Sequence, residues 1–134
     1  MKYGQATPLD IVSVPEISRA KVHVLWINDF YDGPIQGVAE IDGMRVLFDL
    51  VDRDVLGSGN ENRTYWLVSL EPWQLAEEER WHTLFCQHVG THFDFTGREP
   101  IAVPASEHHR FYDRYAQRLE PDYSQNDLVG WFRA

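Results

Sequence analysis

The chain has 134 residues, of which 43% are hydrophobic and 13% aromatic, and this composition excludes disorder for most of the length. The length predicts a single globular domain over residues 1–134. Acidic residues outnumber basic ones by 21 to 12, and the net charge of −9 repels phosphate groups, so we expect neither nucleic acid nor an anionic membrane surface as a partner.

The N-terminal third predicts an irregular arm followed by a strand. Residues 1–20 contain Pro8 and Pro15 among short apolar groups, which is typical of an arm laid over a core. Residues 21–27 (KVHVLWI) are short and rich in β-branched side chains, so they predict a strand. Residues 28–34 (NDFYDGP) are typical of a loop.

The clearest structural signal is the dipeptide Asp42-Gly43 between two apolar runs. A two-residue Asp-Gly link suits a type I′ turn, because both positions of that turn need a positive φ. Residues 35–41 and 44–51 therefore predict the two strands of a β-hairpin.

This turn also predicts the register of the hairpin. It places Gly37 opposite Phe48, whose ring can cover the bare backbone of the glycine. On the other face, it places Glu40 opposite Arg45 as a pair of opposite charges. A slip of one residue would disrupt both faces.

The middle of the chain predicts a fourth strand and a long helix. A polar connection over residues 52–63 leads to residues 64–70, which are typical of a strand. Residues 72–88 predict a helix that begins with a proline and ends before Gly90. The stripe that should face the core consists of Trp81, Leu84, Phe85 and His88.

The C-terminal part predicts shorter elements. Residues 91–96 alternate polar and aromatic side chains, as in a short edge strand, and a second helix should run from Ser106 to about Leu119. Residues 127–132 predict a docked final turn. Together these elements predict an α+β fold, in which an antiparallel meander of about four strands packs against two C-terminal helices.

The predicted loop after the first strand is our candidate binding site. It mixes large aromatic side chains with carboxylates, a combination that protein-binding and ligand-binding surfaces use. A structural interpretation is also open, in which the rings pack under the sheet and the aspartates cap the turn. The candidate residues are Trp26, Asn28, Asp29, Phe30, Tyr31 and Asp32.

A second hypothesis is a metal site formed by His88, His92 and Asp94. The two histidines are four residues apart, and imidazole and carboxylate groups bind divalent metals such as zinc. However, Gly90 interrupts the helix between them, and the spacing matches no established zinc motif. We therefore favour a chain without a cofactor and keep zinc as the alternative.

These patterns favour a non-catalytic protein-interaction or accessory module that regulates a partner. The sequence contains no catalytic-triad, nucleotide-loop or zinc-hydrolase motif. Its acidic charge and aromatic loop suit a basic protein partner, and a homodimer through a sheet edge is a further possibility. The alternative is a metal-dependent enzyme or a small-ligand binder that uses the His/Asp cluster.

The sequence also carries signals of location. It has no apolar run of the roughly 18 residues that a spanning helix needs. Its first ten residues, MKYGQATPLD, lack the apolar core of a secretion signal. With Cys86 as the single cysteine, no internal disulfide can form, so we expect a cytoplasmic protein.

Overall fold

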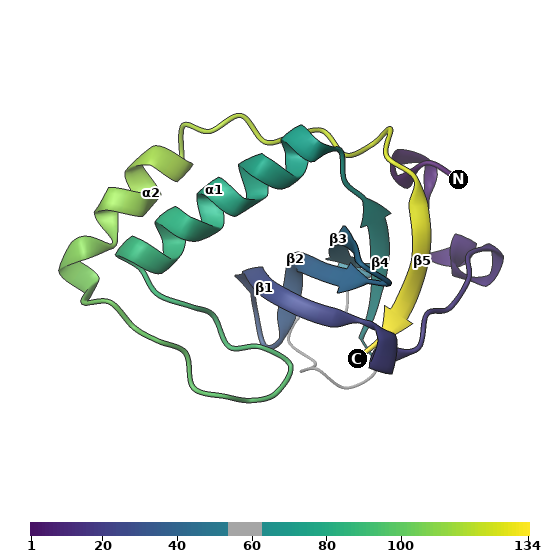
Figure 1. The fold of residues 1–134 in the computed structure, drawn as a ribbon, viewed down its shortest axis with the longest axis horizontal. Coiled ribbons are helices and arrows are strands. Elements are labelled where there is room, and N and C mark those ends of the chain that lie inside the picture. The colour runs from purple at the N-terminus through teal and green to yellow at the C-terminus, as the bar shows by residue number, and fades with distance from the viewer. Residues whose placement is uncertain (54–62) are drawn as a thin grey trace.

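The computed structural model describes residues 1–53 and 63–134 and contains one five-stranded antiparallel sheet with the strand order β1-β2-β3-β4-β5 (Figure 1). The predicted α+β class is therefore confirmed. Most of the predicted polar connection over 52–63 lies outside the described residues. The strands are β1 (His23–Phe30), β2 (Pro34–Ile41), β3 (Met44–Leu50), β4 (Thr64–Ser69) and β5 (Leu128–Arg133), and the α-helices are α1 (Pro72–His88) and α2 (His109–Tyr115).

The hairpin formed by β2 and β3 has the predicted register. Asp42 and Gly43 have φ values of 49° and 79°, as the tight turn requires. Gly37 pairs with Phe48, and a Cβ added at Gly37 would lie 2.2 Å from the backbone oxygen of Trp26 and 2.6 Å from the Phe48 ring. No side chain fits there, so this glycine allows β1 and the ring of Phe48 to approach its backbone closely.

The loop predicted over residues 28–34 is shorter in the structure. Strand β1 continues to Phe30, because Asp29 pairs with Gln36 and Phe30 pairs with Pro34. The connection consists only of residues 31–33, and the backbone amide of Tyr31 donates a hydrogen bond of 2.9 Å to Gly33. Asp29 and Phe30 belong to the strand because their backbone pairs with β2, and local sequence patterns do not reveal this pairing.

The C-terminal segment predicted as a docked turn is instead strand β5, which completes the sheet. It pairs antiparallel with β4, from Thr64 opposite Arg133 to Val68 opposite Leu128. The N-terminal arm covers its outer edge, since the Ile17 amide donates to Trp131 at 2.7 Å and the Trp131 amide donates to Pro15 at 3.0 Å. The arm is irregular, as predicted, and contains three short 3₁₀ turns.

Helix α1 has the predicted bounds, whereas two other C-terminal predictions were wrong. Helix α2 spans seven residues and follows a 3₁₀ turn at Ala105–Glu107, so Ser106 does not cap it. Residues 91–96 form no strand, because Phe95 turns inward and packs against Phe48, Tyr65 and Phe132 in the core. The packing of Phe95 in the core therefore takes the place of the strand pairing expected for residues 91–96.

Apolar side chains fill both faces of the sheet and the contact between the helices. One face contains Ile35, Ala39, Ile41, Val46, Phe48, Leu50, Tyr65, Leu67 and Phe132. The other contains Val14, Leu47, Trp66 and Val68. Trp81 and Phe85 of α1 pack with Phe111 of α2 in a third cluster, and Figure 1 shows the two helices side by side. None of the helices in the described parts of the chain is long and apolar enough to cross a membrane.

Candidate functional site

The centre of the candidate site is Glu78, which points from α1 toward β1 and is only 3% exposed. Its carboxylate accepts a hydrogen bond of 2.8 Å from the side-chain amide of Asn28 and another from the hydroxyl of Tyr123. These residues lie 50 and 45 positions away in the sequence. The buried carboxylate therefore joins the helix, the edge strand and the segment before β5.

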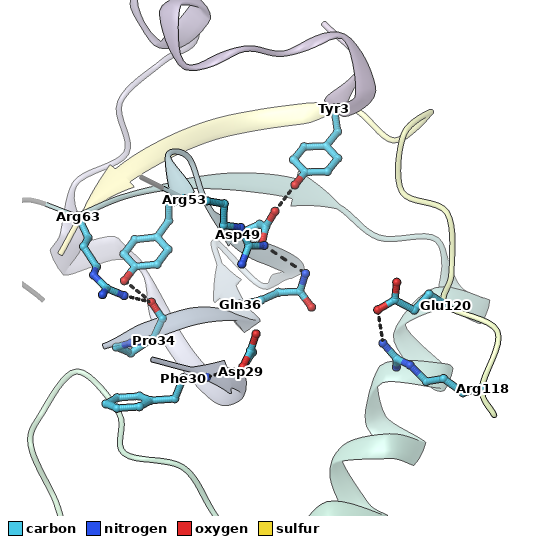
Figure 2. Close-up of polar contacts among 11 residues, drawn as sticks. Tyr3, Asp29, Phe30, Pro34, Gln36, Asp49, Arg53, Arg63, Arg118 and Glu120 are labelled. Atoms are coloured by element: carbon cyan, nitrogen blue, oxygen red, sulfur yellow. Dashed lines mark hydrogen bonds and ion pairs between the residues drawn. The ribbon is translucent and has the colours of Figure 1, made fainter. Parts of the chain in front are cut away.

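A cavity of about 310 Å³ lies beside Glu78, between the sheet and the two helices. Figure 2 shows the sheet side of this region, with Asp29 and Gln36, and the helix side, with Arg118 and Glu120. The cavity combines charged groups with the rings of the helix cluster. Its lining includes Trp81, Phe111, Tyr112 and Tyr115. Pockets that bind small molecules commonly have this mixture of apolar walls and a few polar groups.

A second polar network borders the same cavity on the sheet side. Asp49 accepts hydrogen bonds from the hydroxyl of Tyr3, from Gln36 at 3.4 Å and from Arg53 at 3.0 Å (Figure 2). Burial raises the pKa of the Asp49 carboxyl above its ordinary value, although these donors act in the opposite direction. Gln36 and Arg53 also line the cavity.

Two histidines lie between this cavity and a second one. His82 stacks on Trp26 with ring centroids 4.7 Å apart, and His92 stacks on Phe85 at 4.6 Å. Burial lowers the pKa of both imidazoles, and the proximity of His92 lowers that of His82 further. Both rings are therefore neutral near pH 7.

The second cavity is a groove of about 530 Å³ that follows the outer side of β1. It is lined by residues 22–27 on one side and by parts of the connection between α1 and α2 on the other, including Asp94, Arg98 and Ile101. In Figure 1 this connection passes beside β1 on its way to α2. The two cavities share Ile27, His82, Phe85 and His92.

The structure distributes the six predicted binding residues over different places. Trp26 lines the groove, whereas Asn28 and Asp29 line the smaller cavity. Phe30 is half-buried and packs against Phe93, with ring centroids 5.8 Å apart. Tyr31 and Asp32 are exposed in the turn. The six therefore do not form one aromatic surface.

The three predicted metal ligands are not gathered into a metal site. Among residues 1–53 and 63–134, no group of three or more His, Cys, Asp or Glu side chains is placed to hold a metal ion. Asp94 instead accepts a hydrogen bond of 2.8 Å from the Thr96 amide and pairs with Arg98 at 3.2 Å. His92 is stacked on Phe85, and His88 lies on the last turn of α1.

Sequence reasoning missed the role of Glu78. Its position was a usable signal, because residues 78, 81 and 85 share one face of a helix. A glutamate on the stripe that carries two buried aromatic residues must itself be buried, and a buried carboxylate needs partners. Those partners, Asn28 and Tyr123, could not be identified from spacing.

Comparisons of the chain with protein-family models, with curated proteins and with solved structures each found no match. The class of the protein is therefore described by its own architecture, a five-stranded antiparallel meander with an interacting pair of helices.

Proposed function

We propose that this chain is a protein-interaction module that binds an extended segment of a partner protein along the outer edge of β1. The observation that carries this proposal is the difference between the two edges of the sheet. The N-terminal arm covers the edge of β5 with hydrogen bonds to Trp131. Within the described residues, no other segment forms backbone-to-backbone hydrogen bonds with the outer edge of β1, although the side chain of His92 bonds to the backbone of Asn28 in this strand.

An open strand edge presents unpaired amide and carbonyl groups to an incoming strand. The groove of about 530 Å³ runs beside this edge and gives room for the side chains of such a segment. Leu25 on β1 is 39% exposed and Ile101 across the groove is 71% exposed, so both offer apolar contact. The register shifts around Leu25 and Asn28 interrupt the edge, which favours a specific segment over indiscriminate pairing.

The charge of the chain favours a basic partner. Its net charge of −9 would speed the approach of a positively charged protein and disfavour an acidic one. The groove itself carries charges of both signs, since Arg98 and Asp94 form an ion pair at 3.2 Å within the wall formed by the connection between α1 and α2. Long-range attraction and local pairing of the backbone would therefore act together.

Site-specific photocrosslinking tests this proposal. A photoreactive amino acid is placed at Leu25 or at Ile101, and its matched control is placed at Met44, which is also exposed but lies beside the turn between β2 and β3. We expect both groove positions to crosslink, in cells of the source organism, to one extended segment of the same protein. Mass spectrometry of the crosslinked peptides identifies that segment, and added salt should reduce the yield when the same crosslinking is repeated in a cell extract.

Two results would contradict the proposal. One is a crosslinking pattern at Leu25 and Ile101 that does not differ from that at Met44. The other is a crosslink from Leu25 to a second copy of this chain, because that product would identify the edge as a homodimer interface.

A further inference from the structure

The smaller cavity carries an inference that does not depend on the proposed protein partner. It lies on the opposite side of His82 and His92 from the groove, between β1, α1 and the region of α2. At about 310 Å³ it is large enough for a small organic molecule. The charges of its walls indicate which kind of molecule this is.

The first indication is that Glu78 is buried without a cation. Both of its hydrogen-bond donors, Asn28 and Tyr123, are neutral. The ion pairs of the described residues do not include Glu78. A buried carboxylate is costly unless an opposite charge offsets its loss of hydration. No arginine, lysine or histidine of the described residues forms an ion pair with Glu78 to supply that charge.

The other charged groups of the cavity leave this imbalance in place. Arg53 is paired with Asp49 at 3.0 Å, and Arg118 is paired with Glu120 at 3.3 Å. Asp29 accepts a hydrogen bond from the neighbouring Phe30 amide (Figure 2), and it forms no ion pair among residues 1–53 and 63–134. The two arginines are thus already neutralised, while Glu78 and Asp29 are not, so the cavity has an excess of negative charge.

Aromatic rings add a second feature that suits a cation. The guanidinium group of Arg118 lies 4.3 Å from the ring centroid of Tyr115, so a ring of this wall already holds a positive charge. The neighbouring Tyr112 also lines the cavity and is half-exposed. An ammonium group in the cavity would contact ring faces as well as carboxylates.

The third feature is a pair of buried donors without acceptors. The Trp81 Nε1 and Arg118 Nε atoms have no hydrogen-bond partner among the described residues, and both residues line this cavity. The Trp81 residue is 8% exposed and the Arg118 side chain 9%. Buried donors in native proteins are nearly always paired. An oxygen acceptor on a bound molecule is the group that such donors require.

We propose that this cavity binds a small organic amine that also carries an acceptor oxygen, with its ammonium group beside the Glu78 carboxylate and its oxygen toward Trp81 and Arg118. Amino acids and amino alcohols belong to this chemical class. The Glu78 carboxylate supplies charge recognition, and the aromatic walls offer ring faces to the ammonium group.

Three matched probes test the proposal on the full chain. They are 4-aminobutanoate, which carries both groups, butylammonium, which carries only the cation, and butanoate, which carries only the acceptor. Binding near pH 7 is followed by tryptophan fluorescence, since Trp81 lines the cavity. We expect 4-aminobutanoate to bind most tightly and butylammonium to bind with a Kd of about 1 mM or below. Butanoate should bind at least about tenfold more weakly than butylammonium, because about tenfold is the effect of losing one charge-assisted contact.

The substitution Glu78→Gln keeps the shape and removes the charge, so it should weaken butylammonium binding by about tenfold. The matched control is Glu79→Gln on the next position of α1, where the exposed carboxylate pairs with Arg45 instead. If Glu78→Gln does not fold, Asp29→Asn at an exposed position provides the second test and should weaken binding severalfold. Three results would each overturn the proposal. They are equal affinities for butanoate and butylammonium, no binding of butylammonium at about 10 mM, and an unchanged affinity for butylammonium in a folded Glu78→Gln variant.

Discussion

Phe95 packs edge-on against Tyr65, with ring centroids 5.4 Å apart and ring planes at 88°, and this contact fixes the connection between α1 and α2 to the core of the sheet. The same ring contacts Phe48 and Phe132, while Arg19 lies 5.2 Å above it. A segment without regular secondary structure is thereby held in place beside β1. Phe95 therefore helps to hold the wall of the proposed binding groove, together with His92, which stacks on Phe85.

Replacing Phe95 with alanine should therefore destabilise the protein. We expect the free energy of unfolding to fall by about 3 kcal/mol, because the substitution leaves a cavity among aromatic rings. Phe93→Ala is the matched control, since Phe93 is 43% exposed and packs only against Phe30 among the described rings, and its loss should be about 1 kcal/mol or less. Urea unfolding of the three proteins measures the difference. Equal losses would show that Phe95 does not anchor the segment.

Gly37 should tolerate no side chain. Gly37→Ala places a methyl group against a backbone oxygen of β1 and the ring of Phe48, so the unfolding free energy should fall by about 2 kcal/mol or more. Gly43→Ala serves as the comparison, because that position has open space and only the strain of a positive φ, which costs about 1 kcal/mol. Thermal unfolding and the crystal structure of each variant would test this order. A larger loss at Gly43 would contradict it.

The buried guanidinium of Arg63 should stabilise the turn between β1 and β2. It donates hydrogen bonds of 2.9 Å to the carbonyl of Tyr31 and 3.2 Å to that of Pro34, and Figure 2 shows the contact with Pro34. Arg63→Lys keeps the charge but removes the planar fork, so we expect a loss of about 2 kcal/mol.

The control for this substitution is Arg110→Lys, on the exposed surface of α2, which should change stability by no more than about 0.5 kcal/mol. Guanidinium chloride unfolding curves compare the two. Two variants with the same midpoint would indicate that the buried fork contributes nothing beyond its charge.

His92 should make the protein less stable in mild acid. Burial lowers its pKa in the folded state, so that below the ordinary value of 6.5 the unfolded chain binds a proton more readily than the folded chain does. Stability is therefore fully present above pH 6.5 and is lost as the pH falls through the depressed folded value, whereas the nearby Asp29 carboxylate opposes part of this shift. His82 contributes with the same sign.

Urea unfolding of the wild type and of His92→Gln at about pH 7.5 and about pH 5.5 tests this expectation. The wild type should lose more stability than the variant between the two values, because only the wild type has an imidazole at position 92 whose protonation is disfavoured by burial in the folded state. His109→Gln, at an exposed position of α2, should behave as the wild type does. If the unfolding free energy of His92→Gln falls as much as that of the wild type between the two pH values, His92 does not cause the loss of stability in acid.

Several elements could be predicted because their signals are local. The Asp42-Gly43 turn accepts positive φ at both positions, and the register that follows from it places Glu40 opposite Arg45 in the structure. The expected ion pair between these two residues is not the one that forms, because the Arg45 guanidinium contacts Glu79 of α1 at 2.8 Å. Helix α1 could be bounded from its first proline and the glycine beyond its end. In both cases the deciding residues lie within a few positions of one another.

Other elements depended on distant partners. Residues 128–133 are too few and too mixed to identify a strand, and only pairing with β4 makes them one. Residues 91–96 alternate like a strand, yet the insertion of Phe95 into the core decides their path. In each case the gain in packing with residues far away in the sequence outweighed the local preference.

By itself, the sequence determined the α+β class, the central hairpin with its register and the extent of α1, because turn chemistry and helical periodicity act between neighbouring residues. Only the tertiary structure decided which strand edge is covered and where the cavities lie. The site around Glu78 joins β1, α1 and the segment before β5, and its carboxylate becomes buried only when these segments pack together. Burial and long-range pairing are properties of the folded chain, and no local pattern encodes them.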